Sequence, residues 1–98
     1  MIEVETFENV WFALEANEAD AINMTMRSEL MIAITSAVKS WKLSQEEAAK
    51  KLGITRPRLS DLLRGKINKF SLDMLTMLAY NAGLTVKMSV KKAAAKAA

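Results

Sequence analysis

Apolar side chains recur at helical spacing along most of the chain and predict a series of amphipathic helices. Between residues 17 and 41 neither glycine nor proline interrupts the sequence. The apolar positions three or four residues apart in this stretch are Ile22, Met26, Leu30, Ile34 and Val38. This period is that of one face of an α-helix, so the segment is predicted to be one long helix or two abutting helices. We expect most of this face to enter the core and its N-terminal end to be available to a partner.

Two short helices joined by a tight turn are predicted within residues 43–65, LSQEEAAKKLGITRPRLSDLLRG. Ser44 and Glu47 have the Ser-x-x-Glu spacing of a capping box, which begins a helix. Gly53 falls where a chain leaves a helix through a left-handed residue, and Thr55 can cap the next helix. This order of signals is typical of a helix-turn-helix, which places its second helix in the major groove of DNA.

The second helix of the pair, predicted at Thr55–Arg64, has one apolar and one polar face. Leu59, Leu62 and Leu63 share a face at 3.6 residues per turn and are expected to point into the core. In helix-turn-helix proteins the N-terminal end of this helix lies nearest the base edges, where arginine can donate two hydrogen bonds to guanine. The residues predicted to face the bases are Arg56, Pro57, Arg58, Ser60 and Asp61.

Asp61 has two interpretations, because a carboxylate in the groove is repelled by phosphate. It could accept a hydrogen bond from a cytosine amine. Alternatively it could pair within its own helix with Arg58 or Arg64, each three residues away.

Basic and polar residues cluster around this motif and are predicted to bind the phosphate backbone. Such contacts orient a protein on DNA without reading its sequence. Gln45 has a second interpretation, in which it braces Arg56, and for the whole cluster the alternative is a solvated basic surface. The residues predicted to contact phosphates are Gln45, Thr55, Arg64, Lys66 and Lys69.

Residues 43–73 resemble the XRE/Cro-type helix-turn-helix family, and within it the HigA-type antitoxin branch. The resemblance lies in the run RLSDLLRGK at residues 58–66 and in FSLD at residues 70–73. It covers most of residues 20–90 and implies an all-α, phage-repressor-like bundle of about five helices that binds DNA. The antitoxin branch also implies a HigB/RelE-type RNase toxin as partner. Many relatives have glutamine where this chain has Arg56, so the target bases do not carry over.

After the motif, Ser71 is predicted to cap a further helix that ends at Gly83. The residues that follow alternate between apolar and polar, as in a half-buried strand. A lone strand leaves its backbone groups unpaired, so we expect it to pair with its copy in a second subunit or with a toxin strand. The alternative is an extended tail packed on its own core. The residues of this short β-strand are Thr85, Val86, Lys87, Met88, Ser89 and Val90.

Composition and charge narrow the possible functions. The 98 residues are enough for one domain and include no cysteine and no histidine, so we expect no enzyme, no metal site and no cofactor. The net charge of +3 conceals an asymmetry: residues 1–38 carry seven acidic residues and one arginine, whereas residues 39–98 carry thirteen basic and four acidic residues. A basic segment that coincides with the motif favours DNA binding.

Three segments are expected. Residues 1–16 form a partner-binding or flap segment, residues 17–90 the helix-turn-helix domain, and residues 91–98 a disordered tail. No apolar run approaches the length of a membrane span, and the acidic start lacks the form of a signal peptide, so a cytoplasmic protein is expected.

The predicted function is sequence-specific repression by a homodimer on a pseudo-palindromic operator of double-stranded DNA, with autoregulation and toxin neutralisation implied by the resemblance. The alternatives are a solitary regulator and an interaction module that has lost DNA binding.

Overall fold

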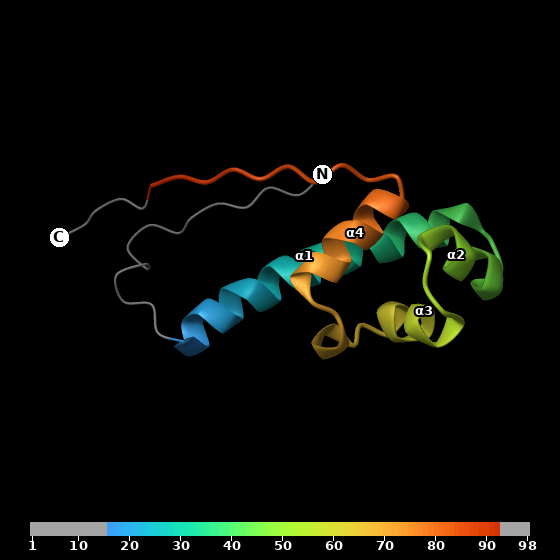
Figure 1. The fold of residues 1–98 in the computed structure, drawn as a ribbon, viewed down its shortest axis with the longest axis horizontal. Coiled ribbons are helices and arrows are strands. Elements are labelled where there is room, and N and C mark those ends of the chain that lie inside the picture. The colour runs from blue at the N-terminus through green and yellow to red at the C-terminus, as the bar shows by residue number, and fades with distance from the viewer. Residues whose placement is uncertain (1–15, 93–98) are drawn as a thin grey trace.

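The structure, a computed structural model, describes residues 16–92 and consists of helices packed around one core (Figure 1). In chain order the elements are α1 (Ala16–Trp41), α2 (Gln45–Leu52), α3 (Arg56–Leu63), the 3-10 helix η2 (Ile67–Lys69) and α4 (Leu72–Asn81). The predicted all-α class is confirmed. Four α-helices and one 3-10 turn occupy the described residues, instead of about five helices. The predicted partner or flap segment lies outside them, apart from Ala16.

Helix α1 is one continuous helix of 26 residues, which settles the choice between one helix and two. Leu30 and Ile34 are buried on α1, whereas Ile22 and Met26 are only half-buried. The reason is that α4 packs against α1 (Figure 1), and the core lies beside the C-terminal part of α1. The apolar face therefore continues beyond the core toward the N-terminus.

The core brings α2, α3 and α4 together beside α1. Ala48 and Ala49 are buried on α2, and their small side chains allow α3 to pack closely against it. Leu59 and Leu62 on α3 have no exposed surface, in agreement with their predicted direction. The large side chains that are fully buried are Phe70, Ile34, Leu52, Leu59, Leu62 and Leu75.

Capping residues begin and end the helices where the sequence predicts. The Ser44 hydroxyl accepts from the Glu47 amide at 3.1 Å, and the Glu47 carboxylate accepts from the Ser44 amide at 3.2 Å. Gly53 adopts a left-handed conformation with φ of 77°, which ends α2 and turns the chain toward α3. Thr55 caps α3 and Ser71 caps α4 through equivalent hydroxyl contacts. These local signals fix the turn between α2 and α3.

The C-terminal segment leaves α4 at Gly83 and continues as extended chain. Leu84 and Val86 are half-buried and pack against the core, whereas Met88 is 70% exposed and Val90 is 77% exposed. The expected strand Thr85–Val90 is not formed here, because residues 16–92 offer no second strand for backbone pairing. The alternative interpretation, packing on the domain's own core, holds for the first half of the segment. Among the described helices none is long and apolar enough to span a membrane.

Candidate nucleic-acid interface

Helix α3 presents a polar face to solvent on the side opposite its buried leucines. Arg56 and Pro57 are exposed in its first turn, Ser60 is half-buried one turn later, and Arg64 is exposed at its C-terminal cap. Pro57 lies where the missing N–H would have no partner within the helix, so the turn forms at little cost. The exposed side of α3 is thus hydrophilic and begins with a cation that no helix covers.

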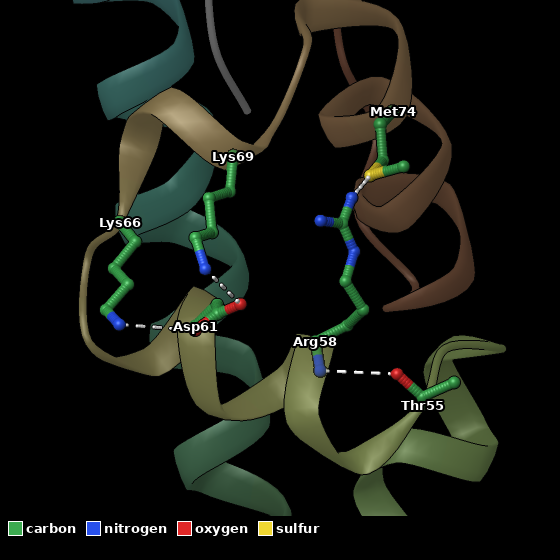
Figure 2. Close-up of polar contacts among 6 residues, drawn as sticks. All are labelled: Thr55, Arg58, Asp61, Lys66, Lys69 and Met74. Carbon is green, nitrogen blue, oxygen red and sulfur yellow. Dashed lines mark hydrogen bonds and ion pairs between the residues drawn. The ribbon is translucent and has the colours of Figure 1, made fainter.

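Arg58 lies at the side of this face and is turned toward α4 (Figure 2). Its Nη2 donates to the Met74 sulfur at 2.6 Å, and its guanidinium carbon lies 4.6 Å from the centre of the Phe70 ring. A guanidinium over an aromatic face is attracted by the ring quadrupole. The side chain therefore helps to join α3 to α4, and it must leave these contacts before it can reach a base.

Asp61 forms ion pairs with two lysines from the loop that follows α3 (Figure 2). Lys66 Nζ lies 3.6 Å from Oδ1, and Lys69 Nζ lies 3.5 Å from Oδ2. The prediction that Asp61 would pair with Arg58 or Arg64 is wrong. The physical reason is that the chain turns back after Arg64, so residues five and eight positions ahead approach the carboxylate more closely than its helical neighbours.

The loop that carries these lysines is held by Arg27 of α1. The Arg27 Nη1 donates to the Ile67 carbonyl at 3.1 Å and to the Phe70 carbonyl at 3.2 Å, and its Nε donates to Asn23 at 2.8 Å. Sequence reasoning missed this residue. One feature of the sequence could have pointed to Arg27: it is the one basic residue among the first 38.

The arrangement of α2, turn and α3 matches known proteins. A family model described as a helix-turn-helix domain matches residues 13–91. The chain belongs to this helix-turn-helix family. A solved structure named as an XRE family transcriptional regulator is 29% identical, covers 81% of this chain and 89% of its own, and superposes with a TM-score of 0.72. No curated protein matches the chain.

The family match makes the chain a DNA-binding helix-turn-helix protein, and its likeness to a structure named as an XRE family transcriptional regulator supports a regulator of that type. Proteins of this kind are generally not enzymes. In this helix-turn-helix protein the remaining predicted phosphate contacts, Gln45 and Thr55, are exposed at the starts of α2 and α3. No hydrogen bond joins the Gln45 side chain to Arg56 within residues 16–92, so the bracing contact of the second interpretation is not present in the described chain.

Proposed function

We propose that this protein represses transcription from its own promoter as a homodimer, with α3 of each subunit in the major groove of a pseudo-palindromic operator. Two such helices would read half-sites about one helical turn, roughly 34–36 Å, apart. The observation that supports the proposal most directly is the polar outer face of α3, which is flanked by exposed cations and backed by fully buried leucines.

The described contacts divide the predicted base readers into two groups. Arg56, Pro57 and Ser60 project from the outer side of α3 and can approach base edges directly. Arg58 and Asp61 already have internal partners, so each has to exchange a contact within the protein for one with DNA. We therefore propose that Arg56, Pro57 and Ser60 are the main residues that read the bases. The proposed phosphate contacts are Gln45, Thr55, Arg64, Lys66 and Lys69.

The proposed homodimer forms through the extended segment 85–90. No backbone hydrogen bond joins these residues to the rest of the described chain, so their N–H and C=O groups are available to a second strand. Exposed apolar side chains at Met88 and Val90 favour the same conclusion, because they would be covered by a partner. A second copy of the chain supplies an identical segment and a closed two-fold interface.

We further propose that the protein is the antitoxin of a HigB/RelE-type toxin, as its resemblance to the HigA branch implies. An open groove of about 960 Å³ along α1 supports a protein partner. Exposed Met24 and Ile32 line this groove beside half-buried Leu63, so apolar surface remains uncovered within the described chain. Exposed Asp20 and Glu29 lie on the same helix and would suit a basic partner. The partner-binding role expected for residues 1–16 is part of the same proposal.

Fluorescence anisotropy tests DNA recognition. The duplex immediately upstream of the protein's own gene is compared with a shuffled duplex across a salt series. Selective binding to the upstream duplex with a steep salt slope is the expected result. Equal weak binding to both duplexes would contradict autoregulation and leave an interaction module as the better account.

Co-expression with the product of the neighbouring gene tests the antitoxin role. A stable complex on size exclusion, and relief of growth arrest caused by that product, are expected. If selective DNA binding is found but no complex forms, the protein is a solitary regulator.

A further inference from the structure

The carboxylate of Asp61 lies between two cations that are expected to contact DNA. Each of its oxygens has one lysine, at 3.6 Å for Lys66 and 3.5 Å for Lys69. The Asp61 side chain is only 18% exposed, whereas the side chains of Lys66 and Lys69 are 43% and 53% exposed. Figure 2 shows both lysines extending from the loop toward the same carboxylate. The group of three therefore carries one net positive charge.

The backbone fixes this arrangement. The Lys66 amide donates to the Asp61 carbonyl at 3.1 Å, and the Lys69 amide donates to the Lys66 carbonyl at 3.1 Å. Gly65 permits the reversal with a φ of 73°, and Arg27 holds the carbonyls of the loop from behind. The two lysines consequently start from defined positions beside the C-terminal end of α3.

We propose that Asp61 is a specificity-determining positioning residue that restrains Lys66 and Lys69 and so suppresses attraction to arbitrary DNA. The proposal rests on the proposed placement of α3 in the major groove. Binding to arbitrary DNA is almost entirely electrostatic, whereas operator binding also includes base contacts. On arbitrary DNA the carboxylate only offsets charge and so weakens binding. On the operator the restrained lysines would meet phosphates at fixed positions, so their pre-ordering recovers part of that loss.

The geometry favours this role over direct reading of a cytosine. Both carboxylate oxygens face lysine ammonium groups, and most of the side chain is covered. A cytosine amine would have to displace a cation from an oxygen that is already paired. The proposed role as a partner of Lys66 and Lys69 needs no such displacement, because both ion pairs are already formed.

The test is Asp61→Asn in the full chain, which keeps the side chain's size but removes its charge. We expect the shuffled duplex to be bound about 3–10-fold more tightly, with a salt slope steeper by up to about one unit. Binding to the upstream duplex should change by a smaller factor, so selectivity falls. Asp73→Asn is the matched control, because Asp73 is exposed in the first turn of α4 and has no ion pair within residues 16–92.

A second set of variants separates positioning from the alternatives. In a Lys66→Gln, Lys69→Gln background, Asp61→Asn should no longer alter either affinity or salt slope. An equal gain on both duplexes would mean general repulsion and overturn the proposal. A loss confined to operators with one particular C·G pair, surviving in the double lysine background, would make Asp61 a base reader and also overturn it.

A different measurement would refute the proposed function, namely the preference of the wild-type protein for the upstream duplex. If the wild-type protein shows no preference for the upstream duplex, the proposal of autoregulation is refuted, and both duplexes then count as arbitrary DNA on which equal gains are expected. In that case the comparison with the Lys66→Gln, Lys69→Gln background alone decides whether Asp61 acts through the lysines. Circular dichroism of each variant verifies that the fold is kept.

Discussion

Asn81, the last residue of α4, donates a hydrogen bond from Nδ2 to the Leu52 carbonyl oxygen at 2.9 Å. Leu52 ends α2, so its carbonyl is one of those that the helix itself cannot satisfy. Gly53 follows in the left-handed conformation. The bond therefore ties α4 to the turn between the two helices of the motif, and it spans 29 residues of sequence.

Replacing Asn81 by alanine removes this bond and should lower the free energy of unfolding by about 0.5–1.5 kcal/mol. Urea denaturation followed by circular dichroism measures the change. Asn68→Ala is the control, since Asn68 is exposed on η2 and its side chain makes no hydrogen bond within the described chain. If both variants lose the same stability, the contact with Leu52 contributes nothing.

Gly53→Ala should destabilise the domain by about 1–2 kcal/mol, because a Cβ disfavours the left-handed conformation. A Cβ at this position would lie 3.6 Å from Asn81 Nδ2, which is ordinary van der Waals contact, so crowding adds little. Gly53→Asn should cost less, since asparagine adopts this conformation more readily. Thermal and urea unfolding of the two variants give the comparison. A larger cost for asparagine than for alanine would show that space rather than φ limits this position.

Arg27→Ala should lower the free energy of unfolding by about 1.5–3 kcal/mol, because two carbonyls lose a charged donor. Arg27→Lys keeps the charge but not the planar fork, so it should restore only part of the loss. Urea unfolding quantifies both variants, with Arg56→Ala as a control at an exposed arginine. Full recovery in Arg27→Lys would show that charge, and not the guanidinium geometry, holds the loop.

Arg56→Ala should reduce selectivity for the operator by about 1–3 kcal/mol, the value of one good bidentate base contact. Anisotropy titrations with operators changed one base pair at a time would locate the lost preference. The expected result is indifference at one position and unchanged preference at the others.

Arg64→Ala is the matched contrast, because Arg64 is exposed at the opposite end of α3. It should weaken binding to all duplexes about equally and make the salt slope shallower by about one unit. If Arg56→Ala behaved in the same way, Arg56 would be a phosphate contact and the base-reading role would pass to other residues of α3.

The elements of the fold were predictable because their signals are local. Ser44 with Glu47, Gly53 and Thr55 each act within one helical turn, and the structure shows each in its predicted role. The contacts that hold the elements together were not predictable in this way. Arg27 and Phe70 are 43 residues apart, and nothing in the pattern of either segment specifies their meeting.

The candidate site was predictable to a similar extent. The division of α3 into buried leucines and a polar face follows from its period. The partners of Arg58 and Asp61 do not, because they depend on where α4 and the loop after α3 lie in space. The proposed pairing of residues 85–90 requires a second chain, so a single copy cannot display it.

Because α1 is uninterrupted, the rotation of its N-terminal part about the helix axis is fixed relative to the part that packs in the core. At about 1.5 Å per residue, its 26 residues extend roughly 39 Å, and the part from Arg27 onward is held by the loop after α3 and by the core. Whatever binds the N-terminal part is held at a fixed rotation about the helix axis relative to α3. One residue inserted before Asn23 would turn the part that precedes it by about 100° while leaving Arg27 and the core in place. The number of residues in α1 therefore sets how a partner bound at its N-terminal part would be oriented relative to α3.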